Sequence, residues 1–123
     1  MPRVLISSPV RYDDGSGNIY DQLNRFILRI RGWGRLSKLD NPEAKQDMIG
    51  RFVADAINEE TCEFISPQKY SEEIRELIKY PVKYDGAVYI WDANTNMILD
   101  FDEVPDDVRE LVAEAMNKKL LRT

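Results

Sequence analysis

Oxygen-bearing side chains recur between residues 92 and 103 at a spacing that suits coordination of a calcium ion. Calcium binds several carboxylate, amide and carbonyl oxygens, and a loop can wrap them around one ion when its positions 1, 3, 5, 9 and 12 carry such groups. In this chain those positions hold Asp92, Asn94, Asn96, Asp100 and Glu103. The residue types therefore make cation binding a candidate chemistry for this stretch.

The stretch resembles the calcium loop of EF-hand proteins, but the segments around it do not. Position 6, where that loop needs glycine for a positive φ angle, is Met97. Pro81 and the turn at residues 85–86 interrupt the segment that would be the entering helix, and Pro105 would fall inside the exiting helix. A hairpin turn in which Asp and Asn supply turn chemistry is therefore favoured. The alternative is a weak cation site at the tip, formed by Asp92, Asn94 and Asn96.

Two β-prone runs, at residues 87–91 and 97–101, predict a hairpin on either side of this turn. The expected cross-strand partners are Val88 with Phe101, Tyr89 with Asp100, Ile90 with Leu99 and Trp91 with Ile98. Because side chains alternate along a strand, one face of the hairpin should be aliphatic and the other aromatic and acidic.

The rest of the chain predicts a small α+β domain. Apolar residues at helical spacing indicate helices over residues 19–30, 42–59, 67–80 and 105–121. Shorter runs at residues 3–8 and 61–65 indicate two more strands. The order β-α-α-β-α-β-β-α predicts one globular domain over residues 1–123, with about four helices and a small, partly antiparallel sheet. No internal repeat is expected.

Composition narrows the classes of protein and of chemistry. The chain has 123 residues, 43% of them apolar and 32% charged, which is typical of a globular domain. It has no histidine and one cysteine, so a Cys/His zinc site, an internal disulfide and imidazole-based catalysis are excluded within the chain. The longest apolar run, at residues 87–91, is too short to cross a membrane, and no signal peptide is recognisable. We therefore expect a cytoplasmic protein without enzymatic activity or cofactor.

Acidic residues concentrate in the C-terminal third, where residues 85–114 hold nine carboxylates and a single basic residue, Arg109. We expect this hairpin and helix to bind a basic protein partner, as in an interaction or inhibitor protein. The residues expected at this surface are Tyr89, Trp91, Asp100, Asp102, Asp107, Glu110 and Glu114. In size and charge the chain resembles small acidic bacteriophage accessory proteins that act on host nucleic-acid machinery, which is an analogy of composition alone.

A basic segment provides the main alternative. Five cations follow one another around Trp33 without an intervening acid: Arg25, Arg29, Arg31, Arg35 and Lys38. On the helix expected over residues 19–30, the first two would share a face and could contact successive phosphates. The net charge of −5 argues against nucleic acid as the main ligand. A homo-oligomer, in which this segment meets the acidic region of a second copy, accounts for the same pattern.

Overall fold

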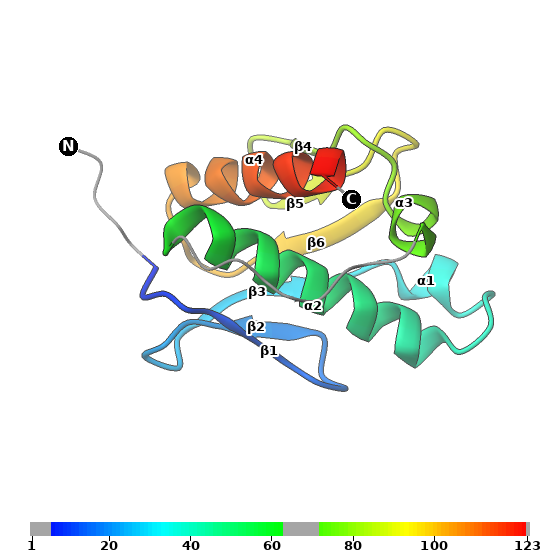
Figure 1. Cartoon of the computed structure of the whole chain (residues 1–123), viewed down its shortest axis with the longest axis horizontal. Coiled ribbons are helices and arrows are strands. Elements are labelled where there is room, and N and C mark those ends of the chain that lie inside the picture. The colour runs from blue at the N-terminus through cyan, green and yellow to red at the C-terminus, as the bar shows by residue number, and fades with distance from the viewer. Residues whose placement is uncertain (1–5, 63–71, 123) are drawn as a thin grey trace.

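The structure, a computed structural model, describes residues 6–62 and 72–122 (Figure 1). Six strands form one antiparallel sheet in the order β1-β2-β3-β6-β5-β4. The strands are β1 (Arg11–Asp13), β2 (Asn18–Tyr20), β3 (Phe26–Ile30), β4 (Lys83–Tyr84), β5 (Tyr89–Trp91) and β6 (Met97–Phe101). The helices are α1 (Trp33–Leu36), α2 (Pro42–Thr61), α3 (Glu73–Leu77) and α4 (Asp106–Arg122). The predicted α+β class is confirmed.

The two long helices, α2 and α4, pack side by side on one face of the sheet (Figure 1). The Tyr12 side chain packs against Gly50 of α2, and Arg109 of α4 lies 5.7 Å from the centre of the Phe101 ring, which identifies the strand positions that face the helices. Fully buried residues of the strands and helices fill the space between the two layers: Ile19, Leu28, Phe52, Ile90, Leu99, Val112 and Met116.

The other side of the sheet has no helix over it among the described residues, and we call it the open face. Because side chains alternate along each strand, it carries the residues between the core positions. These include Arg11, Asp13, Asn18, Tyr20, Phe26 and Arg29 in the first three strands and Lys83, Tyr89, Trp91 and Asp100 in the last three. No helix among residues 6–62 and 72–122 has the length and apolarity that crossing a bilayer requires.

The two halves of the chain repeat one another. Each consists of three antiparallel strands followed by a long helix. The segment Pro-Val-Arg-Tyr-Asp at residues 9–13 recurs as Pro-Val-Lys-Tyr-Asp at 81–85, and Val-Ala-Asp-Ala-Ile-Asn at 53–58 recurs as Val-Ala-Glu-Ala-Met-Asn at 112–117. The expectation that the chain has no internal repeat is therefore wrong.

The final asparagine of each helical repeat makes the same contact. The Val10 N–H donates to Asn58 Oδ1 at 2.7 Å, and Asn58 Nδ2 donates to the Val10 carbonyl at 2.9 Å. The corresponding bonds between Val82 and Asn117 measure 2.8 and 3.0 Å. In each half, this pair of bonds fixes the segment that enters the first strand to the long helix of the same half.

The sheet order places an approximate two-fold axis between β3 and β6. Arg29 lies opposite Asp100 at the centre of this strand pair. The flanking pairs are Leu28 with Phe101 on one side and Ile30 with Leu99 on the other. Leu28 and Leu99 occupy equivalent positions in the two repeats, as do Ile30 and Phe101, so rotation about the axis exchanges the two flanking pairs.

The helix predicted over residues 19–30 is wrong, because this segment forms β2, a loop and β3. Ile19, Leu28 and Ile30 are buried as strand residues, whereas Leu23, which the helical pattern counted as core, is 64% exposed in the loop. β-Branched isoleucine suits a strand better than a helix, and cross-strand packing decided the outcome.

Other boundaries differ less. The strand predicted at residues 3–8 begins outside the described residues, and residues 6–8 are not in a strand. The strand predicted at residues 61–65 begins at Thr61, which is the last residue of α2. Residues 63–65 lie outside the described residues. The helix predicted over 67–80 corresponds to the shorter α3, and residues 67–71 lie outside the described residues.

Candidate functional site

Asp92 holds together the turn between β5 and β6. Its Oδ1 atom accepts hydrogen bonds from the N–H groups of Asn94 and Asn96, both at 2.9 Å. Its Oδ2 atom accepts from the Lys79 N–H at 2.9 Å and from the Asn96 side-chain amide at 3.1 Å. Burial raises the pKa of Asp92, but these hydrogen bonds outweigh it and hold the pKa below its ordinary value.

These donors leave little capacity for a cation. A carboxylate has about four lone-pair directions, and four N–H groups point at Asp92. Asp100, a second proposed ligand, lies 3.3 Å from the Arg31 guanidinium. The described residues contain no group of three or more His, Cys, Asp or Glu side chains placed to hold a metal ion. In the structure the Asp92 oxygens therefore serve the hairpin turn, and the cation site at Asp92, Asn94 and Asn96 stays a prediction.

The loop between β2 and β3 is built in the same way around Asp21. Its Oδ1 atom accepts from the N–H groups of Leu23 and Arg25 at 2.9 Å, and its Oδ2 atom accepts from the Ser7 N–H at 3.3 Å. Burial raises the pKa of Asp21, but the bonds from Arg25 and Ser7 outweigh it and hold the pKa below its ordinary value. Asp21 and Asp92 therefore have one structural role in the two repeats.

The residues predicted to form one acidic surface lie on two layers of the molecule. Tyr89 pairs with Asp100 as predicted, and its ring meets the edge of Trp91 at 5.8 Å on the open face. Trp91 pairs with Met97 instead of Ile98, because a bulge follows Ile90. Three other predicted contact residues are exposed on α4, in the helix layer: Asp107, Glu110 and Glu114.

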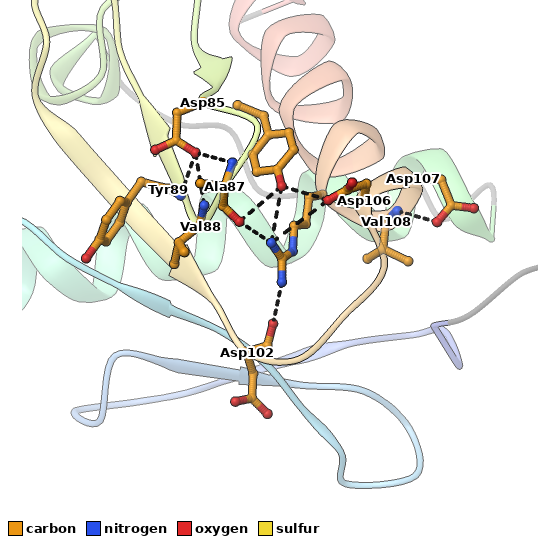
Figure 2. A network of polar contacts seen from close by, with 10 residues as sticks. Asp85, Ala87, Val88, Tyr89, Asp102, Asp106, Asp107 and Val108 are labelled. Carbon is orange, nitrogen blue, oxygen red and sulfur yellow. Dashed lines mark hydrogen bonds and ion pairs between the residues drawn. The ribbon is translucent and has the colours of Figure 1, made fainter.

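Arg109 of α4 joins the helix to the C-terminal strands through side-chain hydrogen bonds. Its Nη1 atom donates to the Tyr84 hydroxyl at 3.1 Å and to the Ala87 carbonyl, and its Nη2 atom donates to the Asp102 carbonyl at 3.2 Å. The Asp102 carboxylate points away from this network (Figure 2). Arg109 therefore has a structural role, and the Asp102 carboxylate lies exposed at the end of β6.

Three of the five predicted cations gather around one hollow beside the open face. Arg29, Arg31 and Arg35 line a cavity of about 510 Å³, and its lining includes no carboxylate. Trp33 also lines it and is 46% exposed. We call this cavity the basic hollow.

The other two predicted cations lie elsewhere. Arg25 is ion-paired with Asp21 at 2.7 Å, and Lys38 is exposed beyond α1. Arg25 and Arg29 do not share a helix face, because residues 26–30 form a strand. Arg29 and Arg31 instead point to the same side because they are two residues apart on an extended segment.

Each arginine of the basic hollow is held by a neighbour. Arg29 Nε donates to Asn18 Oδ1 at 3.0 Å. Arg31 pairs with Asp100 at 3.3 Å, and Arg35 Nη2 donates to the Leu77 carbonyl at 2.7 Å. The Nε atom of Arg35 is buried without a hydrogen-bond partner in the described structure. The arginines are thus positioned in advance while keeping donors for a ligand.

A row of two neighbouring rings flanked by two cations continues from the hollow across the open face. The Arg29 guanidinium lies 5.6 Å from the centre of the Phe26 ring, which is 5.8 Å from the Tyr20 ring. The Arg11 guanidinium lies 5.1 Å from the centre of the Tyr20 ring. We call these four residues the cation–aromatic row. The sequence prediction missed Arg11, Tyr20 and Phe26, because only the pairing of β1, β2 and β3 brings them together.

The positions of the second repeat that are equivalent to the basic hollow carry carboxylates. Where the first repeat has Arg29, Arg31 and Gly32, the second has Asp100, Asp102 and Glu103. Trp33 corresponds to Val104. The basic hollow is therefore a property of one repeat, although the two repeats share their backbone plan.

Guanidinium groups and exposed rings can bind planar or phosphate-bearing ligands, since arginine matches phosphate oxygens in two-bond geometry and rings stack on bases. The Ser16 hydroxyl beside the hollow donates to the Asp13 carbonyl, so it serves the turn before β2. Comparisons with protein families, curated proteins and solved structures give no match for this chain.

Proposed function

We propose that this protein is a non-enzymatic binding protein that holds a phosphate-bearing ligand in the basic hollow. The observation that carries the proposal is the convergence of Arg29, Arg31 and Arg35 on a cavity lined without a carboxylate. Asp100 pairs with Arg31 and offsets part of the positive charge. An anion in the hollow would offset more of it while accepting several charge-assisted hydrogen bonds.

The lining chemistry supports binding more than reaction. Imidazole catalysis is excluded by composition, and the side chains around the hollow include arginine, glutamine, tryptophan and a serine already used in a turn. A cytoplasmic inhibitor of nucleic-acid machinery, which size and charge suggested, would use the same site to compete for a phosphate-bearing ligand.

An NMR titration with inorganic pyrophosphate tests the proposal. We expect saturable shifts of the arginine Nε–H signals of Arg29, Arg31 and Arg35 at low ionic strength. Charge-assisted hydrogen bonds contribute about 1.5–3 kcal/mol each, so Arg29→Gln with Arg31→Gln should weaken binding by about tenfold or more.

The matched control is Arg51→Gln, which removes one cation from α2, where Arg51 pairs with Asp14 at 3.0 Å. This variant should bind pyrophosphate like the unaltered protein. Linear, unsaturated shifts, or an equal loss in the control, would show general ionic attraction and overturn the proposal.

A protein partner with a basic surface is the second proposal, and it rests on the edge-to-face pair of Tyr89 and Trp91 beside Asp100. This half of the open face is aromatic and acidic, which suits lysine and arginine side chains of a partner. A deca-lysine peptide in the same titration would shift the Trp91 Nε1–H signal and spare the basic hollow. Absence of that shift at millimolar peptide would exclude this surface.

A further inference from the structure

We propose that the ligand of the basic hollow is a single strand of nucleic acid, which continues from the hollow along the cation–aromatic row. This inference rests on the proposed function, because the hollow supplies the first phosphate contacts. It adds the chemical class of the ligand, its path over β3, β2 and β1, and the stacking of its bases on Phe26 and Tyr20.

The row places two neighbouring rings between two cations, which suits two successive unpaired bases with backbone phosphates on either side. Arg29, Phe26, Tyr20 and Arg11 follow one another at 5.6, 5.8 and 5.1 Å. Stacking on aromatic rings tolerates every base, while the flanking guanidinium groups attract the backbone. The Asn18 side-chain amide links a cation and a ring of the row. It accepts a hydrogen bond from Arg29 and donates one to the Tyr20 hydroxyl at 3.2 Å.

The ligand must have unpaired bases, because each base would stack on a half-buried ring beside the guanidinium that lies over it. Bases of a duplex stack on one another and present only their edges in the grooves. A protein helix is the usual element that enters a groove, and α4 carries Asp107, Glu110 and Glu114 on its exposed side. That helix would meet phosphates with several like charges, whereas the open face of the first repeat sets the arginines of the row beside Asp13.

The second repeat limits how far the strand extends. Two carboxylates border the row directly, since Asp13 pairs with Asn18 and Asp100 pairs with Arg29 across the strands. Beyond them, Asp102 lies at the exposed end of β6, at the position equivalent to Arg31. Phosphates are therefore attracted to one half of the sheet and repelled from the other, which confines the footprint to about four nucleotides, at the lower limit for single-strand sites.

Fluorescence anisotropy with labelled octathymidylate and octauridylate tests this inference on the full-length protein at low salt. The decisive variant combines Tyr20→Leu and Phe26→Leu, which keeps apolar volume and removes both ring faces. We expect at least a tenfold loss of oligonucleotide affinity, because stacking contributes strongly for each base. Pyrophosphate binding in the hollow should change less than twofold.

The internal repeat provides the matched control. Tyr89→Leu removes a half-buried ring from the same face in the acidic repeat, and it should leave affinity for the oligonucleotide within twofold. Asp102→Asn should raise affinity by about twofold, because it removes repulsion at the border of the site. Thermal unfolding of each variant verifies that the fold is intact.

The outcomes separate the two proposals. Pyrophosphate binding without tighter oligonucleotide binding, or oligonucleotide binding that the ring variants leave unchanged, overturns the single-strand inference and leaves the proposed function standing. Competition by a duplex as strong as that by the single strand also overturns it. Failure of both pyrophosphate and oligonucleotide to bind overturns the proposed function itself.

Discussion

The first and second repeats of this protein share their scaffold and differ on their surface. Both keep an asparagine that binds the entering segment, through Asn58 and Asn117, and both keep an aspartate that ties the second turn, through Asp21 and Asp92. At the centre of the sheet, by contrast, Arg29 of one repeat corresponds to an aspartate of the other. The shared positions maintain the fold, and the positions that differ give the two halves of the sheet different surface charge.

The largest effect should come from the asparagines that the repeats share. Asn58→Ala leaves the Val10 N–H and carbonyl without their partners, and Asn117→Ala does the same at Val82. Each unpaired group costs about 1–3 kcal/mol when buried, so each substitution should lower the free energy of unfolding by about 2–3 kcal/mol. Urea unfolding measures this loss.

These two losses also test the equivalence of the repeats. We expect Asn58→Ala to cost slightly more, because Asn58 is 6% exposed and Asn117 is only half-buried. If one substitution is destabilising and the other is neutral, the two asparagines do not have the same role, and the equivalence of the repeats fails at this position.

A smaller effect should follow from adding a side chain to α2 at Gly50, since the equivalent residue of α4, Arg109, has one. A Cβ atom at Gly50 would lie 2.2 Å from the Tyr12 ring, so Gly50→Ala forces that ring to move. Overpacking of this kind costs typically about 1–3 kcal/mol, which exceeds the gain in helix propensity of about 1 kcal/mol from replacing glycine. A net loss of about 1–2 kcal/mol in urea unfolding is expected.

At Gly34, by contrast, a Cβ atom would meet no heavy atom within 4 Å. Gly34→Ala is therefore the matched control in α1. A net gain of stability in Gly50→Ala would show that Tyr12 has room to move and that the glycine is not required for the packing of β1 on α2.

The smallest effect concerns how the free energy of unfolding declines at acidic pH. The pKa values of Asp21 and Asp92 are held low by hydrogen bonds in the fold, so the unfolded chain binds more protons in acid. Their contribution to stability is present above the unfolded pKa of about 4 and is lost as the pH falls through the folded values. Urea midpoints measured from pH 6 to pH 2 should therefore decline in acid.

Asp92→Asn should lower stability near neutral pH by about 1 kcal/mol, because the amide group turns one acceptor into a donor among N–H groups. It should also flatten the acid decline, and Asp21→Asn should act alike. An unchanged decline in both variants would mean that other carboxylates control acid unfolding.

Local patterns predicted the second repeat well. Alternating side chains fixed the pairing of Tyr89 with Asp100, and the helix predicted over residues 105–121 corresponds to α4. The turn at residues 92–96 followed from Asp and Asn chemistry, although its oxygen spacing also suited a calcium ion. In the structure four N–H groups point at the Asp92 carboxylate, and the sequence does not specify their direction.

The first repeat was harder to predict because its apolar residues fit two periods. Ile19 and Ile27 satisfy helical spacing as well as strand burial, and the pairing of β3 with β2 and with distant β6 selected strands. The repeat itself escaped recognition because equivalent positions are 72 residues apart in β1 and β4 but 59 residues apart in α2 and α4. The basic residues were identified as a group, while their arrangement around Trp33 depends on β3 and α1.

The facing of Arg29 and Asp100 has a consequence for how this sheet can be assembled. In a dimer of two identical half-chains, a residue on the symmetry axis must face its own copy, so an arginine there would meet an arginine. Joining the halves in one polypeptide removes that constraint, and two opposite charges can meet at the centre of the β3–β6 pair. Covalent linkage thus converts an obligatory like-charge contact into an attractive one, and it frees each half to carry a different electrostatic surface.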